Sequence, residues 1–150
     1  MSGIYVSVVI DAPPADVWDV VEAFEHHVDW MADAESIHFT TDQTRGVGTA
    51  FVCVTEVGPV RMRDRMHVTA WEPNAAIGIE HRGAVTGRGR FTLRALSATR
   101  TEFAWTEDLT FPRRTGGRLG AAAAQPVLTA IWRRNLRRLK QIVETRVDTP

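Results

Sequence analysis

The feature that most constrains the fold is a run of six strand-like segments joined by short connections. The segments are rich in β-branched and aromatic residues, and turn-forming residues separate them. They cover residues 35–42, 48–57, 59–71, 75–83, 86–97 and 100–111. A parallel crossover needs about a dozen residues or more, and each of these connections is shorter. The run therefore predicts an antiparallel meander.

A seventh strand and two short helices are predicted before the meander. Apolar residues alternate along residues 4–10, which is the period of a strand. The pair Pro13-Pro14 ends this strand and suits the first turn of a helix, where an N–H group is not needed. Apolar residues then recur at helical spacing as far as Phe24, and a second helical piece covers about residues 25–31.

A long amphipathic helix is predicted after Gly116-Gly117. Apolar residues recur every three or four positions from Leu119 to Val143, which predicts a helix of roughly 28 residues and about 42 Å. Pro126 is expected to kink it.

The predicted architecture is one α+β domain over residues 1–150. A curved seven-stranded antiparallel sheet wraps the C-terminal helix, and two short helices follow the first strand. The long helix is the only element large enough to cover the apolar face of the sheet. A curved sheet cannot lie flush on a straight helix, so we expect a ligand cavity in the gap between them.

Composition excludes several classes of function. The formal net charge is zero, which does not favour a nucleic-acid partner. Cys53 is the only cysteine, so an internal disulfide is impossible and a reducing compartment is expected. We find neither a signal peptide nor an apolar stretch long enough to span a membrane, and therefore expect a cytoplasmic protein. A metal site is not expected, because His26-His27 lacks the spacing of helical ligands, and no cofactor is expected either.

The neutral total hides two charged segments. Residues 11–42 contain nine acidic residues and no Lys or Arg, whereas residues 113–146 contain eight Arg, Lys140 and one acid, Glu144. Two solvated faces that attract each other would explain this pattern. Alternatively, the basic face of the last helix docks on an acidic partner through Arg133, Arg134, Arg137 and Arg138.

Several local strings resemble the START-like (SRPBCC) superfamily of helix-grip proteins, in particular its polyketide cyclase/dehydrase branch. They are VVIDAPPADVWDVV at 8–21, the region of Trp30, GVGTAF at 46–51, Trp71-Glu72-Pro73, residues 101–105, and RRNLRRLKQIVE at 133–144. The resemblance implies a helix-grip fold with an internal cavity for a small hydrophobic molecule, such as a lipid, a quinone or a polyketide. The resemblance is also compatible with a homodimer.

The enzymes that the chain resembles are aromatase/cyclases, which catalyse aldol ring closure and dehydration. Their asparagine on the last helix corresponds to Asn135. Their tyrosine after the second helix is missing, since the only tyrosine is Tyr5. Their middle-strand arginine has three possible counterparts, Arg61, Arg63 and Arg65. A non-catalytic carrier of a lipid or quinone is the alternative.

Four polar residues share a face with apolar neighbours and are candidate catalytic residues: Asp64, His81, Glu107 and Asn135. The two carboxyl groups could enolise a ketone as acids or bases of raised pKa, with His81 as a proton shuttle. Alternatively, the acids pair with neighbouring arginines or bulges turn them outward, and Asn135 makes a capping or helix-to-sheet hydrogen bond.

The predicted ligand-binding residues are Met62, Phe91, Phe103, Trp105, Leu128, Trp132 and Asn135. Their alternative role is ordinary core packing. The other face of the middle strand carries three arginines and His67, which are expected to point to solvent.

Overall fold

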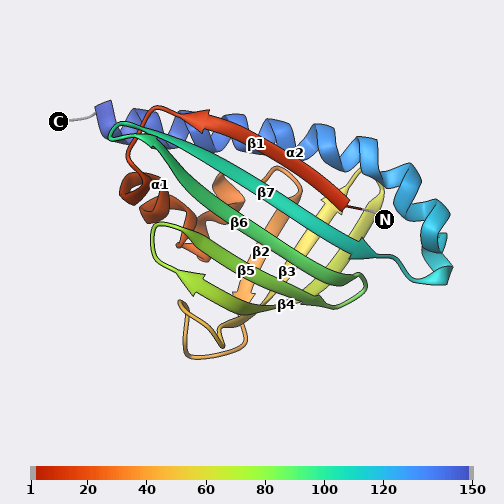
Figure 1. Ribbon diagram of the computed structural model, residues 1–150. Helices are drawn as coiled ribbons and strands as arrows, with labels where there is room; N and C mark the ends of the chain where they lie inside the picture. The colour runs from red at the N-terminus through yellow and green to blue at the C-terminus, as the bar shows by residue number, and fades with distance from the viewer. Residues whose placement is uncertain (1–2, 149–150) are drawn as a thin grey trace.

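A computed structural model describes residues 3–148 and confirms the helix-grip fold (Figure 1). Seven strands form one antiparallel sheet in the order β1-β7-β6-β5-β4-β3-β2, so the predicted meander is correct and β1 closes it beside β7. The strands are β1 (Gly3–Ile10), β2 (Ala34–Phe39), β3 (Ala50–Val57), β4 (Val60–Glu72), β5 (Ala76–Arg82), β6 (Thr86–Ser97) and β7 (Arg100–Thr110).

The helices differ from the sequence prediction mainly at their ends. They are α1 (Pro14–Val21), the 3-10 helices η1 (Phe24–Asp29) and η2 (Arg113–Thr115), and α2 (Gly117–Asp148). The helix α1 ends three residues before the predicted Phe24, because Ala23 has a non-helical conformation (φ −84°, ψ 83°). The helix α2 has 32 residues, more than predicted, and continues through Pro126. Its first turns are inclined to the remainder (Figure 1).

The apolar face of α2 packs against the sheet along β1 (Figure 1). Leu136, Leu139 and Val143 are almost fully buried, whereas the arginines of the opposite face are exposed. The helix α1 adds its own apolar face, with Val17 and Trp18 buried in the same core. None of the helices within residues 3–148 is both long and apolar enough to cross a membrane.

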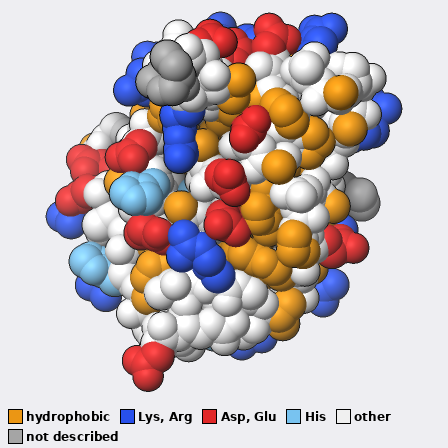
Figure 2. Space-filling model, turned by 90° about the vertical axis from the view of Figure 1, so that its left-hand side faces the viewer, with side chains coloured by type: hydrophobic (Ala, Val, Ile, Leu, Met, Phe, Trp, Pro, Cys, Tyr) orange, Lys and Arg blue, Asp and Glu red, His pale blue; other side chains and the backbone are white. Residues whose placement is uncertain are grey.

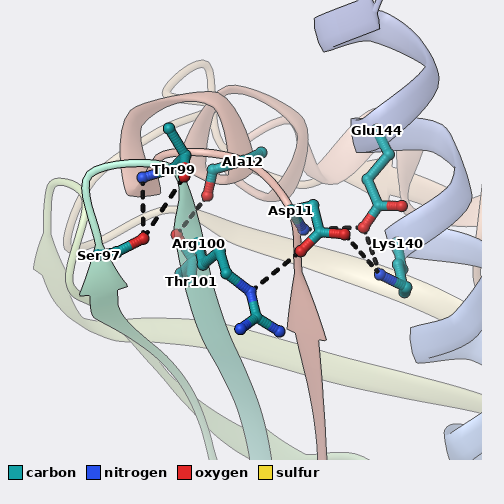
Figure 3. A network of polar contacts seen from close by, with 8 residues as sticks. All are labelled: Asp11, Ala12, Ser97, Thr99, Arg100, Thr101, Lys140 and Glu144. Carbon is teal, nitrogen blue, oxygen red and sulfur yellow. Dashed lines mark hydrogen bonds and ion pairs between the residues drawn. The ribbon is translucent and has the colours of Figure 1, made fainter.

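Polar contacts hold the C-terminal part of α2 to the end of the sheet (Figure 3). Glu144 accepts a hydrogen bond of 2.8 Å from the backbone N–H of Asp11 and also pairs with Lys140. The Asp11 carboxylate in turn accepts a hydrogen bond of 3.1 Å from Nε of Arg100. This network joins the β1–α1 turn, β7 and α2, which are far apart in the sequence.

The part of the acidic segment that includes α1 lies at one end of the molecule (Figure 1). Figure 2 shows acidic side chains between hydrophobic ones on this face, with most basic groups towards its margins. Within residues 3–148, the segment forms one ion pair with α2, between Asp11 and Lys140. The arginine partners of the acidic segment are Arg45, Arg61 and Arg100, which all lie outside α2. The expected attraction between the two charged segments is therefore limited to that pair.

The strand β4 extends beyond its neighbour β5. Its pairing with β5 begins at Met66, opposite His81, whereas its pairing with β3 runs from Val60 to His67. Residues 60–65 therefore pair with β3 alone among the described strands. The hairpin of β3 and β4 projects past the turn between β5 and β6.

The closure of the sheet by α2 is tested with Leu139→Ala. Leu139 has no exposed surface, so we expect its truncation to lower the free energy of unfolding by about 2–5 kcal/mol. Arg138→Ala is the control, because the exposed neighbour should change this free energy by less than about 0.5 kcal/mol. Urea denaturation measures both variants, and equal effects would contradict the packing described.

Candidate functional site

A cavity of about 120 Å³ lies between the sheet, η1 and α2. Its wall is mostly apolar and includes Phe24, Met31, Ile37, Phe51, Met66, Ile79, Val85, Leu109 and Phe111. The stacked rings of Trp105 and Trp132 form one side, with centroids 4.4 Å apart. Because one indole comes from β7 and the other from α2, this stack joins the sheet to the helix beside the cavity.

Eight of the predicted site residues line this cavity. They are Met62, Asp64, His81, Phe91, Trp105, Glu107, Leu128 and Trp132. The strand parity used in the sequence analysis therefore places both acids and the histidine on the inner face. The acids neither point outward nor pair with arginine.

Two predicted site residues do not line the cavity. Phe103 is fully buried and packs against Phe91 and Trp30, at ring distances of 5.3 and 6.4 Å. Strand parity correctly placed Phe103 on the inner face of the sheet. It could not show whether this position on β7 lies beside the cavity or in the packed core. Asn135 is also buried, and it contacts the segment between η1 and β2 instead of the cavity.

Asn135 is linked to the cavity wall through Asp33. Its Nδ2 donates to Oδ1 of Asp33 at 2.8 Å, and its Oδ1 accepts from the backbone N–H of Ala32 at 3.0 Å. Nε1 of Trp132 donates to the other oxygen of Asp33 at 3.2 Å. Asp33 lines the cavity, so these contacts orient a carboxylate in its wall. Sequence reasoning missed Asp33, because it lies in an irregular segment with no parity to show its direction.

Asp64, His81 and Glu107 form a buried hydrogen-bonded triad. Nδ1 of His81 lies 2.7 Å from Oδ2 of Asp64, and its Nε2 lies 2.8 Å from Oε2 of Glu107. The second oxygen of Glu107 accepts a hydrogen bond of 2.9 Å from Nε1 of Trp105. Gly89 lies directly beside this carboxylate, and a Cβ atom at that position would come within 2.3 Å of it. The absence of a side chain on β6 therefore makes room for Glu107.

The triad holds its imidazole as a cation. Burial lowers the pKa of His81, but the hydrogen bonds and charges of the two carboxylates outweigh it and raise the pKa to about 10. Both ring nitrogens then donate to carboxylates, so neither is free to accept a substrate proton. The geometry supports the structural network considered in the sequence analysis, with His81 instead of arginine as the cation.

Asp64 keeps one buried oxygen, Oδ1, that has no hydrogen-bond partner within residues 3–148. Gly83 packs closely against Asp64, since a Cβ atom there would lie 2.7 Å from Oδ1. An unpaired buried acceptor is costly, and such groups in native proteins often mark a functional position.

His27 is a second cavity histidine, and its environment is the opposite of that of His81. Its Nε2 lies 2.6 Å from the carbonyl oxygen of Val21 and must donate to it. Burial lowers the pKa of His27 to about 4 despite this hydrogen bond, so the ring is neutral at pH 7. Nδ1 then carries a lone pair, and it is a hydrogen-bond acceptor in a residue that lines the cavity. Sequence reasoning missed this role of His27, because the adjacent pair His26-His27 suggests at most a metal ligand.

The remaining ionisable group of the wall is Cys53. Burial raises the pKa of its thiol to about 11, so it is protonated and weakly nucleophilic at neutral pH. Within residues 3–148, no group of three or more His, Cys, Asp or Glu side chains is arranged to hold a metal ion.

Comparisons with known proteins agree with this fold. A family model described as polyketide cyclase/dehydrase and lipid transport matches residues 1–144. No curated protein sequence matches the chain significantly.

Three solved structures illustrate the similarity. The Zhui aromatase/cyclase from Streptomyces sp. R1128 is 19% identical with a TM-score of 0.77, and the match covers 98% of this chain and 96% of that one. A protein from Thermus thermophilus is 18% identical with a TM-score of 0.75, over 95% and 97% of the two chains. A START superfamily protein from Mycobacterium smegmatis is 15% identical with a TM-score of 0.70, over 97% of each chain. At these low sequence identities, the similarity to the three structures shows a shared fold.

The neutral state of His27 predicts a specific acid sensitivity. Its pKa is lowered from 6.5 to about 4, so its contribution to stability is complete above pH 6.5 and is lost as the pH falls towards 4. We expect His27→Gln to reduce the loss of unfolding free energy between pH 7 and pH 4 by up to about 3 kcal/mol. His26→Gln is the control on the exposed side of η1. Urea denaturation across this range measures both variants, and parallel curves for wild type and His27→Gln would contradict the assignment.

Proposed function

Because the chain belongs to the family of polyketide cyclase/dehydrase and lipid transport proteins, we propose that it binds a small, mostly apolar molecule in the cavity between the sheet and α2. The observation that carries this proposal is the cavity itself. Protein interiors are close-packed and contain few voids larger than a water molecule. An apolar hollow of about 120 Å³ in a small domain therefore favours a binding role.

The size of the cavity limits the part of a ligand that it encloses. Pockets for drug-sized ligands measure about 300–1,000 Å³, whereas an apolar cavity of about 150 Å³ holds one benzene molecule. A cavity of about 120 Å³ therefore matches a single ring or a short alkyl segment. This favours the ring of a quinone-like or polyketide-like molecule, or the end of a lipid chain.

The polar groups of the wall support orientation of that ligand. The lone pair on Nδ1 of the neutral His27 can accept a hydrogen bond from a ligand, and the Asp33 carboxylate is fixed by Trp132 and Asn135. Few polar groups in an apolar wall are typical of sites that select a ligand by one hydroxyl or amine. We propose that the ligand carries a hydrogen-bond donor on its ring or close to it.

An enzymatic role is the second candidate, and the unpaired Oδ1 of Asp64 favours it. In an aldol cyclisation or dehydration, a buried carboxylate of this kind could take a proton from carbon next to a ketone. His81 would then position Asp64 and Glu107 and would not transfer the proton itself. This candidate keeps Asp64 and Glu107 as proposed catalytic groups, with Asn135 as a positioning residue for Asp33.

Filling the cavity tests the binding proposal. Leu128 lines the cavity, whereas its neighbour Val127 is half exposed on the same helix. We expect 4-phenylbutanol to bind the wild-type protein and to bind Leu128→Trp at least tenfold more weakly, because the indole occupies the space of the phenyl ring. Val127→Trp should bind as the wild type does. Isothermal titration calorimetry gives the affinities, and equal binding by all three proteins would place the ligand elsewhere.

The enzymatic candidate is tested with a short polyketone substrate and product analysis. If it is correct, the wild-type protein accelerates ring closure, and the combined Asp64→Asn, Glu107→Gln and Asn135→Ala substitutions lower the rate by about 100-fold or more. Circular dichroism checks that this variant remains folded. A rate equal to that of the wild type would remove the enzymatic candidate, and the binding proposal would be unaffected.

A further inference from the structure

A second, open pocket lies on the outer side of the sheet, where the β3–β4 hairpin extends past β5. Its volume is about 400 Å³, and its lining is Val52, Arg63, Arg65, Gly83, Ala84 and Arg114. The arginines come from two separate elements, since two lie on β4 and Arg114 lies on η2. The lining contains three cations and no acidic side chain.

The three arginines of this pocket lack the acidic partners that other arginines of the sheet have. Arg61, Arg82, Arg90 and Arg94 each pair with a carboxylate. Within residues 3–148, Arg63, Arg65 and Arg114 form no ion pair, and Arg65 donates only to the carbonyl oxygen of Arg82 at 3.3 Å. Convergence of unpaired guanidinium groups on one pocket is repulsive, and an anion would relieve the repulsion.

The pocket adjoins the internal cavity. Ala84, in the turn between β5 and β6, lines both of them. Along β4 the side chains alternate, so Met62 and Asp64 line the cavity while Arg63 and Arg65 line the outer pocket. Gly83 allows the turn to approach β4, since a Cβ atom there would lie 2.7 Å from the backbone nitrogen of Arg65. The turn between β5 and β6 therefore borders the apolar hollow on one side and the cluster of cations on the other.

We propose that Arg63, Arg65 and Arg114 bind the anionic head group, a phosphate or a carboxylate, of the molecule whose apolar part fills the cavity. This inference rests on the proposed function and extends it to an amphipathic, anionic ligand. Guanidinium groups bind both oxyanions through paired N–H donors, and no carboxylate in the pocket competes for them. The head group remains at the surface, so its charge keeps most of its hydration.

Three probes test this assignment: 4-phenylbutanol, 4-phenylbutyl phosphate and inorganic phosphate. Paired hydrogen bonds from guanidinium groups to an oxyanion are among the strongest in proteins, so we expect the phosphate ester to bind at least tenfold more tightly than the alcohol. The double variant Arg63→Gln/Arg114→Gln should lose this advantage and still bind the alcohol within twofold of wild type. Isothermal titration calorimetry at fixed ionic strength measures all affinities.

The control variant is Arg61→Gln/Arg90→Gln, which removes the same charge from the outer face at arginines that already have acidic partners. It should keep the tenfold advantage. An equal loss in both double variants would show general charge attraction and would overturn the site.

The remaining outcomes separate this inference from the proposed function. Binding of the alcohol with no gain from its phosphate overturns the head-group site and leaves the cavity proposal intact. If 4-phenylbutanol and inorganic phosphate each bind, but 4-phenylbutyl phosphate binds no more tightly than the alcohol, the pocket binds a separate anion. That result overturns the head-group assignment. Arginine-dependent binding of inorganic phosphate without binding of the alcohol supports an anion site and contradicts the cavity proposal.

Discussion

The packing of α2 against the curved sheet is the contact on which the rest of the structure depends. Leu136, Leu139 and Val143 are buried in the C-terminal half of the helix, where polar contacts also hold it to the β1–α1 turn and, through Asp11, to β7. Towards its N-terminal half the helix contributes Leu128 and Trp132 to the cavity wall. The same helix therefore closes the core at one end and leaves a hollow at the other. The difference between these two halves creates the site.

Burial and hydrogen bonding set the charges of the two cavity histidines. They have opposite protonation states, because His81 lies between two carboxylates whereas the buried His27 donates to a carbonyl oxygen. The wall also presents the Asp33 carboxylate and the unpaired Oδ1 of Asp64, acceptors that favour a ligand that donates hydrogen bonds. The three side chains of the triad hydrogen-bond to one another. The triad therefore fits the role of a rigid wall that orients a ligand better than the role of a proton-transfer group.

The sequence predicted the fold well, because alternation along strands and helical spacing along α2 are properties of local chain geometry. The same parity placed Asp64, His81 and Glu107 on the inner face, but their mutual contacts depend on register between strands, which the sequence does not show. Asp33 and His27 were missed because they lie in irregular or 3-10 segments without a simple period. Asn135 was correctly placed on the buried stripe of the helix, yet helical spacing could not decide between the cavity and the adjoining loop.

The unequal lengths of β4 and β5 have a consequence for motion. The outward-facing amides and carbonyls of residues 60–65 have no strand partner beyond β3, so this part of the sheet is held on one side only. Opening there would break few backbone hydrogen bonds and would leave α2 in place. By contrast, residues 101–108 of β7 pair with both β1 and β6. The segment of β4 that is paired on one side thus borders both the hollow and the arginine pocket.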